Sequence, residues 1–279
     1  MVEQVAGDMG LQLNHSMSEI ICVGPTTRQS LAAFPNFCVV SQDHATLLGS
    51  PIGNSVEGID DTISAKISAL AVMGGRFCLL HAHDAFCLLK NAFTLPKMLY
   101  TLRTAPFFLS SQLQSFDDLQ RSLLADIANI PLDANDPAWV QVVLPLGSGG
   151  LGIRSASQLA PSAFLASAAS SSELTRQILP PGLQEAPCPS HGVALALWSS
   201  GHDESPPSAP ASFLQRSWDA LRVSLAYRNI LESAPDAPAR AACLPLAQRS
   251  QGHGYRPSLY HRWVCTWTRR WFEWAWASA

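Results

Sequence analysis

The sequence is short of charged residues, of regularly spaced cysteines and of long apolar runs, and each shortage excludes a class of protein. Asp, Glu, Lys and Arg make up only 14% of the 279 residues, against about 25% in an ordinary soluble protein. The net charge is -3, which does not suit a chain that coats nucleic acid along its whole length. Apolar residues reach 47%, which is enough to bury a substantial core.

Cysteine usage and the missing targeting signals bear on the compartment. The seven cysteines are an odd number and form no CxxC pair, which favours reduced thiols over a disulfide framework. The first residues contain no basic segment followed by an apolar block, so we expect no signal peptide. No run approaches the ~18 consecutive apolar residues of a membrane span. We therefore expect an intracellular protein, cytoplasmic or nuclear, that is not secreted and does not span a membrane.

Residues 1–58 consist of short apolar runs separated by turns. The runs EIICVG, FCVVS and HATLLG are brief and partly β-branched, which is typical of short strands. The stretch TLLGSPIGNS, Thr46 to Ser55, places two glycine-containing turns next to each other. We expect a small antiparallel β element here.

Residues 59–170 carry a helical pattern. Ile63, Ile67 and Leu70 fall at i, i+4 and i+7, the apolar stripe of a helix packed on one face. We expect at least three helical segments up to residue 131, an interruption at Gly74-Gly75, and a later helix around PSAFLASAAS. The predicted fold class is mainly α with a small antiparallel β element at the N-terminus (α+β), and the helices form a bundle.

The composition changes again after residue 170. Residues 171–212 are rich in Ser and Pro and have no clear apolar period, which favours an irregular linker. Residues 213–279 begin with the amphipathic pattern FLQRSWDALRVSLAYRNIL and end in a tryptophan-rich tail. We interpret this last part as helical.

Two motifs look like small-ligand sites but lack essential parts. GSGGLG (147–152) has no Lys-Ser/Thr after it to reach phosphate and metal, so a plain turn is favoured. HAHDAFC contains metal-ligand types at His81, His83, Asp84 and Cys87, but a closed zinc site needs four ligands. A helix start capped by Asp84 is favoured, and a Cys/His metal protein is kept as an alternative. No small-molecule substrate is evident.

Positive charge gathers between residues 62 and 115. Five Lys or Arg stand there against one Asp, which gives +4 within a chain of net charge -3. Such a segment can face phosphate or form an ordinary solvated surface, and charge alone does not separate the two. A second basic, aromatic segment is the tail, where arginines flank four tryptophans at helical spacing: Trp263, Trp267, Trp271 and Trp274. For this tail, packing on its own domain or no selected role is favoured over a membrane surface or single-stranded nucleic acid.

The order of three motifs resembles a known family. GLQLN and SEII (10–21) come first, LLGSPIG (47–53) follows, and helices then begin with IDDTISAKISAL (59–70). This order is similar to the back half of a reverse transcriptase from a non-LTR retrotransposon, where the palm edge is followed by the primer-grip hairpin and the helical thumb. LLKNAFTLPKMLYTLRTAP and LPLGSGGLGIRSASQLAPSAFLAS also resemble that family's region after the grip. The resemblance covers residues 10 to about 170 and, more faintly, Phe213 to Leu231.

The resemblance implies nucleic-acid binding by the primer grip and the thumb. A primer strand is held by its backbone whatever its sequence, and a tight Gly/Pro hairpin lets the main chain approach phosphate and sugar closely. The implied partner is RNA–DNA or RNA duplex, bound weakly and without sequence specificity. The residues expected to bind are Gly49, Ser50, Pro51, Gly53, Lys66, Lys90, Lys97 and Arg103.

The chain also departs from the family pattern. Polymerisation requires two metal ions, Mg²⁺ in the intact parent enzyme, held by aspartates that the family carries upstream of the GLQLN segment. Asp60-Asp61 follow the grip and Asp117-Asp118 fall within a helix, so neither pair suits this role, and Met17 replaces a family lysine. We therefore expect a truncated reverse transcriptase (RNA-directed DNA polymerase) remnant with no catalytic residues and no cofactor of its own. The alternative is a non-enzymatic α-helical interaction protein that has kept only the fold.

Overall fold

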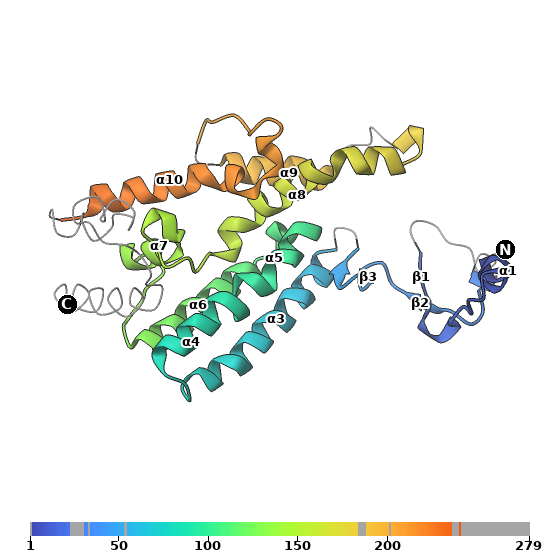
Figure 1. The fold of residues 1–279 in the computed structure, drawn as a ribbon, viewed down its shortest axis with the longest axis horizontal. Helices are drawn as coiled ribbons and strands as arrows, with labels where there is room; N and C mark the ends of the chain where they lie inside the picture. Colours follow the sequence, from blue (N-terminus) through green and yellow to red (C-terminus); the bar gives the residue numbers. More distant parts are fainter. Residues whose placement is uncertain are drawn as a thin grey trace. The chain divides into compact units, whose positions relative to one another are not determined.

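The computed structural model describes residues 2–22, 31–32, 34–52, 55–183, 188–200, 202–235 and 240. These residues are mainly helical, with a small β element near the N-terminus, as the sequence predicts (Figure 1). By its contacts the chain divides into two units, 1–62 and 63–279, and the division falls inside helix α3 (Val56–Phe77). Each unit is described by itself below.

The first unit holds two kinds of strand pairing. After helix α1 (Val2–Asp8), strand β1 (Glu19–Ile21) pairs in parallel with β2 (Cys38–Val40). The sequence predicts strands at both places but not their parallel pairing. The predicted antiparallel element is the hairpin of β3 (Thr46–Leu47) and β4 (Ser50–Pro51).

The second unit begins with helices that lie side by side (Figure 1). After α3 come α4 (Ala82–Leu88), a π-helix (Leu89–Phe93), α5 (Leu95–Thr104) and α6 (Gln112–Ala128). The prediction of at least three helical segments between 59 and 131 is therefore confirmed. Their apolar stripes are buried: Leu70, Met98, Leu102 and Phe116 are each at most 2% exposed.

The sequence predicts an interruption of the helix at Gly74-Gly75, and this prediction is wrong. Helix α3 continues through both glycines to Phe77. A Cβ on Gly74 would lie 2.3 Å from Cδ2 of Leu123 in α6, whereas nothing lies within 4 Å of a Cβ on Gly75. Gly74 therefore allows α3 and α6 to approach closely. The glycine serves packing between helices and does not end one.

Several helix ends follow their sequence signals. Helix α5 has Pro96 in its first turn and ends at Thr104, before Pro106. Helix α7 (Pro137–Val143) is capped by Asp136, whose carboxylate accepts from the N–H of Ala138 at 2.8 Å. Helix α4 corrects one prediction: its N-cap residue is His81, and Asp84 lies in the first turn. A carboxylate in the first turn still interacts favourably with the positive end of the helix dipole.

Helix α8 (Ala156–Ile178) begins at a buried carboxylate from another helix. Asp117 of α6 is 3% exposed and accepts from the hydroxyls of Ser155 and Ser157 at 2.7 and 2.6 Å. It also accepts from the backbone N–H groups of Ala156 and Ser157 at 2.7 and 3.1 Å. Burial raises the pKa of Asp117, while these hydrogen bonds oppose the rise. The carboxylate thus satisfies N–H groups that a helix start leaves unpaired.

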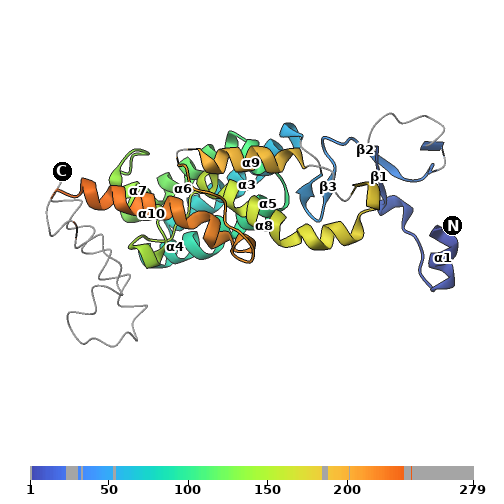
Figure 2. The ribbon, with the colours of Figure 1, turned by 90° about the horizontal axis from the view of Figure 1, so that it is seen from above.

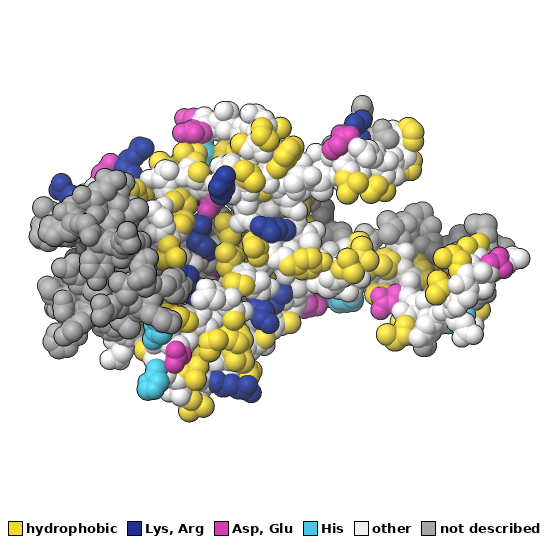
Figure 3. Space-filling view, in the orientation of Figure 1, with side chains coloured by type: hydrophobic (Ala, Val, Ile, Leu, Met, Phe, Trp, Pro, Cys, Tyr) yellow, Lys and Arg dark blue, Asp and Glu magenta, His cyan; other side chains and the backbone are white. Residues whose placement is uncertain are grey.

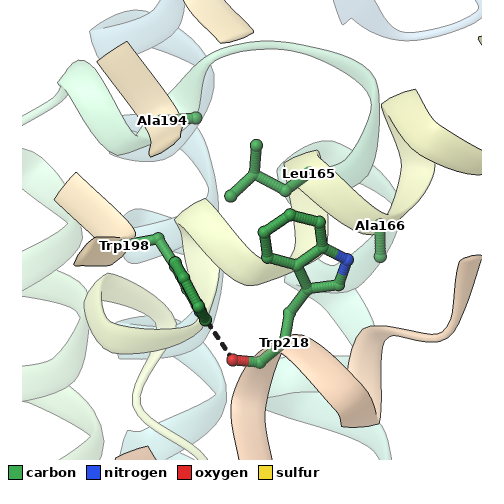
Figure 4. Close-up of a cluster of buried hydrophobic side chains, with 5 residues drawn as sticks. All are labelled: Leu165, Ala166, Ala194, Trp198 and Trp218. Carbon is green, nitrogen blue, oxygen red and sulfur yellow. Dashed lines mark hydrogen bonds between the residues drawn. The ribbon is translucent and has the colours of Figure 1, made fainter. Parts of the chain in front are cut away.

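The sequence predicts an irregular linker over residues 171–212, but much of this segment is helical. Helix α8 continues to Ile178, and α9 (Pro189–Ser199) follows. Trp198 explains the second helix: it packs in a buried cluster with Trp218, Leu165, Ala166 and Ala194 (Figure 4). Its Nε1–H donates to the carbonyl of Trp218 at 2.6 Å, and the two indoles meet edge to face at 5.2 Å. Burial of a large aromatic side chain outweighs the local preferences of Ser and Pro.

Helix α10 (Gln215–Ser233) runs along α8 (Figures 1 and 2), where the sequence predicts a helix. Arg222 joins the three helices, because its guanidinium donates to the carbonyls of Gln158 in α8 at 3.1 Å and Leu197 in α9 at 2.9 Å. Asp219 pairs with Arg154 just before α8. Among the helices described, none is both long enough and apolar enough to cross a membrane.

Candidate nucleic-acid interface

The hairpin of the first unit has a two-residue turn. Leu47 stands opposite Ser50, so Leu48 and Gly49 form the turn, with φ of 52° and 78°. Positive φ at both central positions is the pattern of a type I′ turn, whose twist matches that of paired strands. Glycine adopts this conformation readily, while leucine does so at a cost of about 1–2 kcal/mol.

The hairpin presents its turn and buries its second strand. Leu48 is 85% exposed and Gly49 is exposed as well, whereas Ser50 and Pro51 are buried. Of the expected grip residues, Gly49 therefore offers accessible backbone, and the side chains of Ser50 and Pro51 hold the hairpin in place. Gly53 lies outside the described residues.

Gly58 seats the loop before the hairpin against the first turn of α3. A Cβ on Gly58 would lie 2.3 Å from the carbonyl oxygen of Asp43 and 3.8 Å from Cβ of Pro51. Only glycine permits this approach of two backbones. The sequence interpretation did not single out Gly58, although a glycine at a helix start is a signal of close backbone packing.

In the second unit the structure brings two of the predicted basic residues together. Lys66 of α3 donates from Nζ to the carbonyl of Lys97 in α5 at 3.1 Å. Burial lowers the pKa of Lys66, and the nearby charge of Lys97 lowers it further. Among the described residues, no carboxylate lies within ion-pair distance of either lysine. Two positive charges thus lie close together without a neutralising partner in that part of the chain.

Lys90 and Arg103 contact other parts of the second unit. Lys90 is half-buried, with Nζ 3.4 Å from the position of a Cβ on Gly152, and burial lowers its pKa. Arg103 donates from Nε and Nη2 to Oε1 of Gln215 at 3.2 and 2.8 Å. On the face drawn in Figure 3, Lys and Arg side chains are spread among hydrophobic ones and do not form a single patch. Lys66 and Lys97 are the expected basic residues whose charges the structure brings together, and such a pair can bind phosphate.

Most N–H groups of the glycine loop 147–152 are already used within the fold. Those of Gly149, Gly150, Leu151 and Gly152 donate to backbone carbonyls in α7 and in the residues between α7 and the loop. Gly149 and Gly152 have φ of 79° and 74°, a backbone conformation that favours glycine. This geometry supports the interpretation as a plain turn.

The other candidate sites stand as follows. In α4, Sγ of Cys87 lies 3.7 Å from Nε2 of His83. Within the part of the chain that the structure describes, no three His, Cys, Asp or Glu side chains come together as metal ligands. The tryptophan tail, with Trp263, Trp267, Trp271 and Trp274, lies outside the described residues.

Comparison of the chain with protein-family models, with curated proteins and with solved structures gives no match. The order of the sequence motifs and the geometry of the hairpin and the lysine pair are the observations that bear on function. The hairpin and the lysine pair belong to different units.

Proposed function

We propose that this chain is the palm-edge, primer-grip and thumb remnant of a non-LTR reverse transcriptase, and that it binds RNA–DNA or RNA duplex through the sugar–phosphate backbone without polymerising DNA. The observation that carries the proposal is the pair Lys66 and Lys97, which lies in the helices that follow the grip-like hairpin.

A phosphate would relieve the charge repulsion in this pair. Lys66 is partly removed from water and close to a like charge, and both effects disfavour its charged form. An anion bound between the two ammonium groups would favour the charged form of both. Duplex nucleic acid offers phosphates at regular spacing, and lysine contacts to them release counterions.

The hairpin supports the proposal through its exposed backbone. The turn at Leu48-Gly49 extends from a buried second strand, so main-chain groups can approach a sugar or phosphate without a long side chain between them. Such a contact would carry no base-specific information. We therefore propose binding without sequence preference.

The described aspartate pairs support binding without catalysis. Asp117 has its carboxylate occupied by serine hydroxyls and backbone N–H groups at the start of α8. Asp61 follows the hairpin and lies 4.0 Å from Nδ1 of His44. Neither pair resembles two carboxylates that share metal ions at an open site.

Binding of a labelled RNA–DNA duplex, followed by fluorescence anisotropy, tests the proposal. Replacing Lys66 and Lys97 by Ala should weaken binding by roughly sixtyfold at about 0.1 M salt, because each of the two lost phosphate contacts contributes about 0.9 log units there. The matched control is Arg76→Ala with Arg228→Ala, which removes the same charge from two exposed positions. An equal loss of affinity in both double variants would show that the lysine pair has no special role. Replacement of both lysines by Arg, which keeps the two charges, should retain binding.

A non-enzymatic interaction protein is the second candidate, and specific contacts favour it. Lys90 and Arg103 are used inside the fold, against Gly152 and Gln215. Leu174 and Ile178, four residues apart on α8, are 61% and 72% exposed, which suits an apolar contact with another protein. A chain of this kind would show no salt-dependent affinity for duplex.

A further inference from the structure

Helix α4 carries a thiol and an imidazole in contact. His83 and Cys87 are four residues apart, which places both on one face of the helix, and Nε2 lies 3.7 Å from Sγ. Lys90 follows three residues after Cys87. Burial lowers the pKa of Lys90, and the negative charge of the nearby Cys87 sulfur acts in the opposite direction. The π-helix Leu89–Phe93 begins directly after this turn, and π segments within helices occur frequently at functional sites.

We propose that Cys87 is a reactive thiol, assisted by His83 as base and by the Lys90 ammonium, and that it forms a reversible mixed disulfide with a low-molecular-weight disulfide. A thiolate is the reactive form of cysteine, and adjacent His or Lys favours it. The same pair interpreted as a metal site lacks further ligands among the described residues.

The exchange is balanced with the disulfide as the oxidant. The thiol proton of Cys87 moves to Nε2 of His83, and the thiolate attacks one sulfur of R–S–S–R. The S–S bond of the small molecule breaks as the Cys87–S–S–R bond forms. The departing R–S⁻ then takes the proton from the imidazolium as R–SH.

Other cysteines of the chain provide internal controls. Cys78 is more exposed than Cys87, but its Sγ–H donates to the carbonyl of Gly75 at 3.1 Å, and a carbonyl oxygen does not act as a base. Cys188 is exposed, and no imidazole of the described residues lies within hydrogen-bond distance of its sulfur. If exposure alone decided reactivity, both would react before Cys87.

The test is alkylation of the native full chain by iodoacetamide near neutral pH, with the rate at each cysteine resolved by peptide mass spectrometry. We expect Cys87 to react faster than Cys78 and Cys188. The variant His83→Gln should slow Cys87 by about tenfold, because an unassisted thiol is only a few per cent thiolate near pH 7. The rates at Cys78 and Cys188 should not change, which shows that the effect is confined to Cys87, and equal helicity by circular dichroism shows that the variant is folded. Oxidised glutathione in place of iodoacetamide should then give an adduct at Cys87 that dithiothreitol removes.

Four outcomes would overturn the proposal. Cys87 could react no faster than Cys78, its rate could be the same in His83→Gln, or oxidised glutathione could leave it unmodified. Stoichiometric zinc in the purified chain that blocks alkylation of Cys87 would also overturn it, in favour of a metal site.

Discussion

The carboxylate of Asp117 connects two helices through hydrogen bonds to three successive residues at the start of α8. Since burial raises its pKa, the folded chain holds a proton on this group more readily than the unfolded chain does. Its contribution to stability is then complete below the ordinary Asp pKa, about 3.9, and is lost as the pH rises through the folded value.

The variant Asp117→Asn tests this pH dependence, because an amide does not titrate. The free energy of unfolding of the wild-type chain, relative to the variant, should fall as the pH rises from about 3.5 toward 7. Urea unfolding at a series of pH values measures it. A relative stability that rises over this range would show that the hydrogen bonds to the carboxylate outweigh the effect of burial.

Two adjacent glycines of α3 should respond in opposite directions to the same substitution. Gly75→Ala should raise the free energy of unfolding by about 0.5–1 kcal/mol, since alanine favours a helix and no atom lies near the new Cβ. Gly74→Ala should lower it by about 1–3 kcal/mol, since Leu123 must move to admit the methyl group. Denaturant unfolding of both variants checks the pair, and equal effects would contradict close packing of α3 on α6.

At the scale of elements, α9 depends on one aromatic contact. Trp198→Ala should lower the free energy of unfolding by about 3–5 kcal/mol. Trp198→Phe should lower it less, by about 1–3 kcal/mol, because it keeps an aromatic ring but leaves the carbonyl of Trp218 without its donor. Unfolding followed by tryptophan fluorescence and by circular dichroism measures both. Equal losses in the two variants would mean that the hydrogen bond, and not ring burial, holds α9.

Local signals in the sequence were sufficient for most elements. The apolar stripe of Ile63, Ile67 and Leu70 predicts α3, Pro96 marks the first turn of α5, and the Gly49-Ser50-Pro51 segment predicts the hairpin. Each signal lies within a few residues of the structure that it predicts, so no knowledge of distant contacts is needed.

Features that depend on distant contacts could not be predicted in this way. The partners Trp198 and Trp218 are 20 residues apart, and Lys66 and Lys97 are 31 apart. The Ser/Pro-rich composition around α9 indicates only local preferences, and the charge count between 62 and 115 does not show which lysines meet. The parallel pairing of β1 with β2 is likewise set by contacts between separate segments. For the candidate site, the sequence therefore predicts the residue types and the hairpin, but not which basic side chains lie together.

At the scale of the whole molecule, the proposed function makes a negative prediction about catalysis. The purified chain, with dNTPs, Mg²⁺ and a primed RNA template, should give no primer extension above buffer, because the sequence has no aspartate pair placed to hold two metal ions. Polyacrylamide gels of labelled primer measure this. Template-dependent extension by the pure chain would overturn the interpretation as a remnant.

A competing site for nucleic acid is the tryptophan tail, which a truncation separates from the lysine pair. A chain without residues 255–279 should retain duplex affinity if Lys66 and Lys97 provide the phosphate contacts. Loss of binding on this truncation, with no loss in the double lysine variant, would assign the affinity to the tail, where aromatic rings can stack on bases.

The most direct test of the proposed function is the salt dependence of duplex binding. The plot of log K against log salt concentration should be linear for the wild-type chain, and its slope should be flatter by about two units in the Lys66→Ala, Lys97→Ala variant, one for each lost phosphate contact. Helicity by circular dichroism should be equal in the two chains. A wild-type affinity that does not depend on salt, or a slope that the double substitution leaves unchanged, would contradict binding of the phosphate backbone by this lysine pair.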